Sequence, residues 1–350
     1  MSGSGADRAG DAPAHHRGTR FQNNDVEFEP KDLAELLKWR RNAWREGLPK
    51  APRHATPQVA ADLAFLHANA SAGAAMVPAL TWIGHASTLL QAGGANLLTD
   101  PIFSERASPL PFAGPKRHVA PGLAAAELPH IDAVLISHNH YDHLDVASVK
   151  ALAAQAGGPP RFIVPLGLAT WFARIGIGGE SVVELDWWQS TRIGTVEIVF
   201  TPAQHWSGRS LADRMATLWG GYAIFAPDFH AWFAGDTAYS KDFAEIHRRF
   251  AARQGGGRGF DLALIPIGAY EARWFMRAQH VDPEEAVRIH RDVFAERSIG
   301  IHWGTFQLTD EPLDEPPLAL QRALRLAGLD DGTFSTLAVG ETRRLPRRAP

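Results

Sequence analysis

The chain has 350 residues, 45% of them hydrophobic and 21% charged, a formal net charge of −3 at pH 7 and no cysteine. This is the composition of a globular protein with a sizeable core; the missing cysteine excludes disulfides and thiolate ligands, so a metal would be held by His, Asp or Glu. The slightly acidic charge gives no attraction for nucleic acid, which we exclude as a partner.

The first 78 residues differ in character from the rest. Residues 1–24 contain few large apolar side chains, which predicts a disordered N-terminal tail. They lack the apolar segment of a secretory signal, and no uncharged apolar run approaches the roughly 20 residues that span a bilayer, so we expect a cytoplasmic protein. Residues 25–78 are predicted to form a helical, wrapping extension, with a helix over 31–45 that carries on one side Leu33, Leu36, Leu37 and Trp44.

Residues 79–345 are predicted to form the main domain. Short apolar or β-rich runs predict strands at 79–84, 87–91, 95–100, 132–137, 162–165, 195–202, 222–226, 230–236, 261–267 and 298–304. Helical patterns lie among the later runs, at 145–156, 168–175, 240–250, 282–294 and 316–328. The mixture favours an α/β fold of two sheets packed face to face with helices outside, although a doubly wound sheet fits the same pattern.

The stretch ISHNHYDHLD, residues 136–145, follows one of these predicted strands. Side chains alternate along an extended segment, so His138 and His140 project to the same side. Asp142 and His143 follow as the chain turns towards a helix that Asp145 can cap. Four ligand-type residues within six positions predict a metal site rather than an ordinary polar loop.

Three further ligand-type residues each follow an apolar run: His205, Asp236 and His302. An unpaired imidazole or carboxylate at such a position would be costly. Taken singly, His205 could be a hydrogen-bonded core histidine and Asp236 an ordinary turn residue. With the four residues of the first motif they make seven ligands, which is enough for two metals with water between them.

His280 directly precedes a predicted helix start. Asp282 as N-cap, Pro283 in the first turn and Glu285 at the third position form a strong helix N-terminus. His280 therefore lies where backbone N–H groups favour an anion, although a surface loop histidine is the alternative. His85 and Asp100, each at a predicted strand end, are expected to support the site from outside the ligand set.

The segment HNHYDHLD resembles the HxHxDH signature of the metallo-β-lactamase superfamily. Other segments, above all QHVDPEEAVRIH at 279–290 and IGAYEARWFM at 267–276, are similar to the N-acylphosphatidylethanolamine-hydrolysing phospholipase D family. The resemblance covers about residues 79–344, and the segment before Trp82 departs from the family. It implies the αβ/βα sandwich of the metallo-β-lactamase fold, with two mixed sheets face to face.

The resemblance also implies a binuclear zinc centre and the roles of its residues. His138, His140 and His205 would hold one ion, Asp142, His143 and His302 the other, and Asp236 would bridge them. Asp142 and His280 would be catalytic, and Tyr141 and His280 would contact the substrate phosphate. Two Zn²⁺ per chain are expected, with iron or manganese as alternatives, since His and carboxylate ligands suit those ions too.

The implied activity is a phospholipase D type phosphodiesterase. It would hydrolyse N-acylphosphatidylethanolamine-like lipids to N-acylethanolamine and phosphatidic acid by attack of a metal-bridging hydroxide on phosphorus. The alternative is a lactonase, or another ester or phosphodiester hydrolase of the same fold, with a small soluble substrate. A non-catalytic binding module is disfavoured by the intact ligand set.

The expected partners are a phospholipid substrate, a peripheral membrane surface and a second copy in a homodimer. The loop 102–115 offers three apolar side chains for shallow insertion into a membrane surface, Phe103, Leu110 and Phe112. Inward packing of the same side chains on the core is the alternative.

Overall fold

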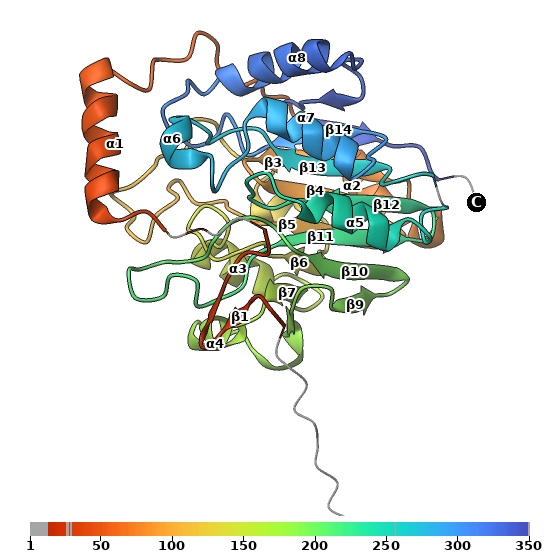
Figure 1. The fold of residues 1–350 in the computed structure, drawn as a ribbon. Helices are drawn as coiled ribbons and strands as arrows, with labels where there is room; N and C mark the ends of the chain where they lie inside the picture. Colours follow the sequence, from red (N-terminus) through yellow and green to blue (C-terminus); the bar gives the residue numbers. More distant parts are fainter. Residues whose placement is uncertain (1–12, 26–27, 29, 256, 349–350) are drawn as a thin grey trace, which may run out of the picture.

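The computed structural model describes residues 13–25, 28, 30–255 and 257–348, and its strands form two layers (Figure 1). Within this part of the chain each layer is a seven-stranded sheet. The first runs in the order β16 (Thr342–Arg344), β3 (Ala79–Gly84), β4 (Ser87–Ala92), β5 (Ala95–Thr99), β6 (Ala133–Leu135), β7 (Arg161–Pro165) and β8 (Val182–Leu185). The second runs in the order β15 (Phe334–Ser335), β14 (Ser298–Ile301), β13 (Leu262–Pro266), β12 (Phe229–Phe233), β11 (Gly221–Ala226), β10 (Val196–Thr201) and β9 (Ser190–Ile193).

Both sheets are mixed. β16, β3, β4 and β5 pair antiparallel and β5 to β8 pair parallel, while β9 to β12 pair antiparallel and β12 to β15 pair parallel. Successive side chains alternate between two covered faces: Leu90 and Leu97 enter the core between the sheets, and Leu89 and Leu98 face the helices. Because both faces are covered, central strands such as β3, β11, β12 and β13 are buried along their whole length. The predicted sandwich with helices outside is confirmed.

Helices cover the outer face of each sheet (Figure 1). α2 (Leu63–Ala70), α3 (Val146–Ala153) and α4 (Ala169–Arg174) supply Leu66, Val149 and Phe172 to a cluster with the first sheet. The helices α5 (Asp242–Phe250), α7 (Pro283–Asp292) and α8 (Glu315–Ala327) pack on the second sheet. The predicted start of α7 is confirmed, since Asp282 and Glu285 form a capping box with Pro283 in the first turn.

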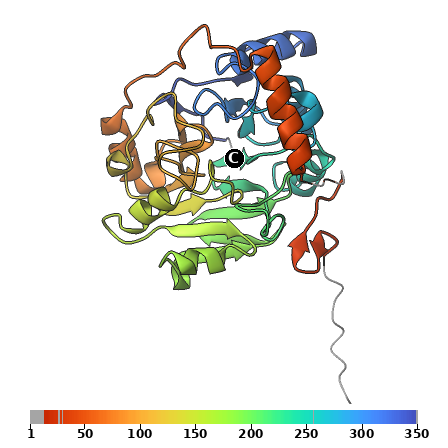
Figure 2. The ribbon, with the colours of Figure 1, turned by 90° about the vertical axis from the view of Figure 1, so that its left-hand side faces the viewer.

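The extension before the sheets lies along the domain. The Nδ2 group of Asn69 in α2 donates to Gln91 in β4, and Thr56 Oγ1 donates to the Gly304 carbonyl. The predicted helix is α1 (Leu33–Glu46), which stands beside α6 (Arg273–Met276) in Figures 1 and 2. It packs through Trp39, whose ring stacks on Phe275 at 4.9 Å, whereas the apolar residues Leu33, Leu36, Leu37 and Trp44 are exposed. The described residues contain no helix long and apolar enough to cross a membrane.

The prediction of a disordered tail is wrong for residues 13–24. They form a hairpin of β1 (His16–Arg17) and β2 (Arg20–Phe21), and the Phe21 N–H donates to the Met215 carbonyl at 2.8 Å. The segment has few large apolar side chains, but His15, His16 and Asn23 find polar partners on the domain. Composition does not reveal such partners. Residues 1–12 lie outside the described residues.

Candidate metal centre

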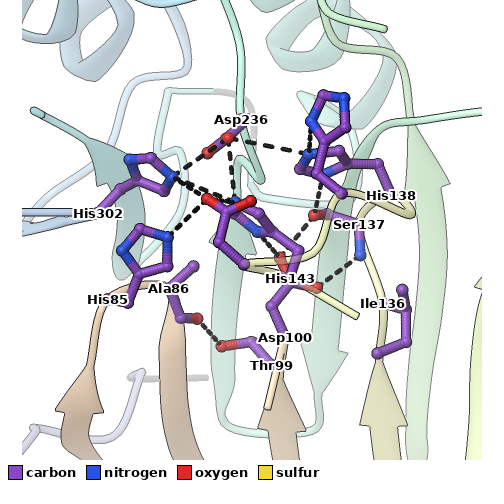
Figure 3. A network of polar contacts seen from close by, with 12 residues as sticks. His85, Ala86, Thr99, Asp100, Ile136, Ser137, His138, His143, Asp236 and His302 are labelled. Atoms are coloured by element: carbon purple, nitrogen blue, oxygen red, sulfur yellow. Dashed lines mark hydrogen bonds and ion pairs between the residues drawn. The ribbon is translucent and has the colours of Figure 1, made fainter. Parts of the chain in front are cut away.

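The structure brings together all seven predicted ligand residues at one edge of the sandwich. His138, His140, Asp142 and His143 follow β6, His205 follows β10, Asp236 follows β12 and His302 follows β14. Each of these segments leaves the end of a buried strand, and His302 comes directly after its strand, so the two sheets deliver their polar residues to a common edge. Figure 3 shows Asp236 with His302 on one side and His138 on the other.

Three histidines form the first group. The Nδ1 atom of His140 lies 2.8 Å from Nε2 of His138 and 3.3 Å from Nε2 of His205. Burial holds the pKa of His138 well below its usual range, and it lowers the pKa of His140 to about 3 and that of His205 to about 4. Neutral imidazoles at neutral pH keep lone pairs for a cation, which fits the donor set of a metal site.

The second group joins Asp142, His143 and His302. Oδ2 of Asp142 lies 3.3 Å from Nε2 of both histidines, which are 3.1 Å apart. Burial opposes charge on Asp142, but the imidazole of His143 and hydrogen bonds from three histidines hold its pKa well below the usual range. Burial also lowers the pKa of His302, but the Asp236 carboxylate and hydrogen bonds to Asp142 and Asp236 outweigh this and raise it to about 9. The carboxylates therefore compensate the positive charge gathered here.

Asp236 lies between the two groups. Its Oδ2 atom faces five imidazole Nε2 atoms, at 3.0 Å from His143, 3.2 Å from His302, 3.8 Å from His138 and His280, and 3.9 Å from His205. Its Oδ1 atom is buried and has no hydrogen-bond partner among the described residues. A buried carboxylate oxygen without a donor is costly unless something else binds it. This position fits a carboxylate that bridges two cations.

Buried acceptors orient the imidazoles of the centre. Asp100 accepts from Nδ1 of His143 at 2.6 Å and from the backbone N–H of Ser137 at 2.7 Å. The Gln279 carbonyl accepts from Nδ1 of His205 at 2.8 Å. These contacts fix the tautomer that turns each Nε2 towards the centre. His85 supports Asp142 instead, with its Nε2 atom 2.9 Å from Oδ2, so both residues that we expected to support the site lie there.

Asn23 was not predicted as part of the site. Its Oδ1 atom accepts from the N–H of His205 at 3.1 Å, and its Nδ2 donates to the carbonyl of the same residue at 2.9 Å. Trp219 Nε1 also donates to Asn23 Oδ1, at 3.0 Å. Asn23 thus holds the backbone of a predicted ligand. Its segment has no apolar pattern, so the sequence carries no signal for this role.

His280 and Tyr141 lie at the border of the centre. The His280 imidazole is buried, and its ring centroid is 5.1 Å from that of His205 and 5.4 Å from that of His302. Burial holds its pKa well below the usual range. Tyr141 donates to the Arg209 carbonyl at 3.2 Å, and the Arg209 guanidinium lies 3.9 Å from its ring centroid. Tyr141 also lines a groove, together with Arg209.

Gly268 makes a close contact that the centre depends on. A Cβ atom at this position would lie 2.2 Å from the carbonyl oxygen of His302, which is backbone and cannot give way. We expect Gly268→Ala to displace His302, to lower the free energy of unfolding by about 1–3 kcal/mol and to reduce metal content. Gly178→Ala is the control, because nothing lies within 4 Å of its added Cβ. Equal melting temperature and metal content in both variants would contradict this.

The comparisons with known proteins agree with this geometry. The family described as "Beta-lactamase superfamily domain" matches residues 95–303. The isothiocyanate hydrolase from Delia radicum gut bacteria superposes with a TM-score of 0.58 at 21% identity, covering 76% of this chain and 99% of that one, which shows the shared fold. Fold and site thus define a metal-dependent hydrolase of the metallo-β-lactamase superfamily.

Two relatives narrow the assignment. The N-acyl-phosphatidylethanolamine-hydrolyzing phospholipase D 1 of Caenorhabditis elegans is 40% identical over 271 residues, which cover 75% of this chain and 74% of that protein. The mitochondrial enzyme of the same name from Saccharomyces cerevisiae is 35% identical over 260 residues, covering 73% of this chain and 53% of that protein. The chain belongs to the N-acylphosphatidylethanolamine-hydrolysing phospholipase D-like family of this superfamily.

Proposed function

We propose that the protein is a zinc-dependent phosphodiesterase of phospholipase D type, which hydrolyses N-acylphosphatidylethanolamine-like lipids to N-acylethanolamine and phosphatidic acid. One observation carries this: Oδ2 of Asp236 lies within 3.9 Å of imidazole nitrogens from both ligand groups. A carboxylate so placed suits a pair of cations, and paired cations suit phosphoryl transfer to water. The names of the two relatives support the lipid substrate.

We assign the seven residues to two zinc ions, with His138, His140 and His205 at one, Asp142, His143 and His302 at the other, and Asp236 between them. When bound, the ions would supply hydroxide at neutral pH and neutralise charge on the phosphoryl oxygens. The chain orients its ligands through Asp100 and the Gln279 carbonyl. Exclusion of water by the buried cluster strengthens each of these interactions.

His280 and Tyr141 are assigned to the substrate. The Nε2 atom of His280, 3.8 Å from Oδ2 of Asp236, is near enough to contact a phosphate held at the centre. Tyr141 lines a groove of about 660 Å³ together with Leu110, Pro111, Lys150 and Arg209. Cationic side chains beside apolar ones suit a phospholipid, whose headgroup is anionic and whose chains are apolar.

The structure corrects one member of the proposed membrane loop. Phe103 packs inward on the cluster beneath α3, and its N–H donates to Oγ of Ser148 at 2.8 Å. Leu110 and Phe112 are exposed by 45% and 77%. Residues 102–115 contain no helix and no named strand, so no periodicity in the sequence separates the inward from the outward side chains. We therefore propose that Leu110 and Phe112 meet the membrane surface.

The double variant Leu110→Ser/Phe112→Ser is expected to bind anionic phospholipid vesicles several-fold more weakly, because apolar area inserted into the interface is lost. Hydrolysis of a soluble phosphodiester should stay unchanged. Vesicle co-sedimentation and turnover on the same preparation measure both. Leu326→Ser on α8, also exposed, is the control. Equal vesicle binding by the wild type, the double variant and the control would show that the loop does not contact the membrane.

A homodimer stays a prediction, supported by the exposed apolar side chains of α1, Leu33, Leu37 and Trp44. We further propose a cytoplasmic protein that works peripherally on membranes. The function itself is tested by incubating zinc-loaded protein with N-acylphosphatidylethanolamine, phosphatidylcholine and a panel of lactones. Release of N-acylethanolamine without lactone turnover supports the proposal, and turnover of the lactones alone overturns it in favour of a lactonase.

A further inference from the structure

Away from the metal centre, three ligand-type side chains converge from two distant parts of the chain. Nε2 of His15 lies 2.6 Å from Oδ1 of Asp186, and Nε2 of His16 lies 2.7 Å from Oδ2 of the same carboxylate. The potential ligand atoms of all three residues lie within 4.8 Å of one another. His15 lies 171 positions and His16 lies 170 positions from Asp186 in the sequence, and the fold brings the three together.

The surroundings fix this cluster in place. His15 and Asp186 are buried, and the His15 ring packs on Trp187 with a centroid distance of 4.3 Å. Asp186 also accepts from the Trp187 backbone N–H at 2.7 Å, which sets the direction of its carboxylate. The His16 side chain is 25% exposed, so one side of the cluster is open to water.

We propose that His15, His16 and Asp186 form a further site for a divalent transition-metal cation, separate from the centre at Asp236, which clamps the N-terminal hairpin onto the domain. Two imidazoles and a carboxylate are a donor set that suits zinc, iron, nickel or manganese. The open side next to His16 leaves room for water to complete the coordination.

The two rings are arranged like a pair of the predicted ligands in the main centre. The rings of His15 and His16 stand edge to face at 4.7 Å and 77°, close to the 4.5 Å and 83° of His138 and His140. Among the described residues, the ion pairs of Asp186 are those with these two histidines. A cation would satisfy the carboxylate and both Nε2 lone pairs at once.

The clamp would act on the main centre through the hairpin. The Gln22 N–H donates to the His15 carbonyl at 2.9 Å, so the clamped residues hold the strand that leads to Asn23. Asn23 in turn holds the backbone of His205 on both sides. A cation that fixes the hairpin would therefore also fix Asn23, which positions the backbone of His205.

The decisive variant is His15→Gln/His16→Gln. A glutamine amide still donates N–H groups to Asp186 but offers no imidazole lone pair, so a hydrogen-bonded clip survives while a cation site is lost. His54→Gln, at an exposed histidine, is the matched control. We expect the wild type and the control to bind one more zinc equivalent per chain than the double variant in equilibrium dialysis. We also expect zinc to slow tryptic cleavage at Arg17 and Arg20 in these two proteins alone.

Equal zinc content in all three proteins, with cleavage indifferent to zinc, would overturn the proposal and leave a clip of hydrogen bonds. Asp186→Asn gives a second test, since it also loses the carboxylate ligand. If neither variant folds, zinc is titrated into wild-type protein that already holds two ions per chain. Zinc-dependent shifts of the His15 and His16 ring resonances in NMR then support the site, and resonances indifferent to zinc overturn it. Tryptic cleavage and the ring resonances report on the hairpin itself, so these results do not depend on the proposed phosphodiesterase function.

Discussion

Asp236→Asn is expected to lower turnover strongly and to remove one or both ions from the centre. The carboxylate stands between five imidazoles, and an amide cannot supply the negative charge that holds two cations close together. Metal catalysis contributes several kcal/mol, and each 1.36 kcal/mol is tenfold in rate, so we expect a loss of about 10³-fold or more. Metal analysis and turnover on one preparation measure this.

Asp228→Asn is the matched control, because Asp228 precedes the same strand, β12, at its other end and pairs with Arg347 at 2.7 Å. It should keep its metal and its activity. Full metal content and normal turnover in Asp236→Asn would show that the Asp236 carboxylate does not bridge two cations.

His280→Ala is expected to keep both metals and the fold while turnover of N-acylphosphatidylethanolamine falls by about 10²- to 10⁴-fold, the range for groups that take part in proton transfer. The seven assigned ligands are complete without His280, yet its Nε2 atom lies 3.8 Å from Asp236. Loss of the imidazole should therefore affect the substrate and leave the metals in place.

The variant His290→Ala distinguishes a loss of turnover caused at the substrate from one caused by a less stable fold. His290 is buried in α7, the helix that follows His280, and its Nδ1 lies 2.8 Å from Oγ of Ser298. We expect a lower melting temperature with full activity per folded molecule. The same behaviour in His280→Ala, or unchanged turnover with full metal, would take His280 out of the reaction.

The ligand residues could be predicted because each follows a buried apolar run, where a histidine or aspartate needs a partner. The buried apolar runs also located most strands of both sheets to within a residue or two. The short strands β8, β9, β15 and β16 were not predicted, because runs of two to four residues carry little pattern.

Contacts between distant segments account for the rest. Asn23 and the hairpin before it gain their order from polar partners more than 160 positions away, which composition cannot show. Asp100 was expected near the site because it ends a strand, but its pairing with His143 depends on how β5 and β6 lie side by side. Such partners follow from the fold, not from the local sequence.

Hydrolysis in water enriched in heavy oxygen shows directly whether water attacks phosphorus. Zinc-loaded protein is given N-acylphosphatidylethanolamine, and both products are analysed by mass spectrometry. Attack of water on phosphorus breaks the bond to the ethanolamine oxygen, so we expect one heavy oxygen in the phosphatidic acid and none in the N-acylethanolamine. Heavy oxygen in a released fatty acid, with the phosphodiester left intact, would contradict attack on phosphorus and show an ester hydrolase instead.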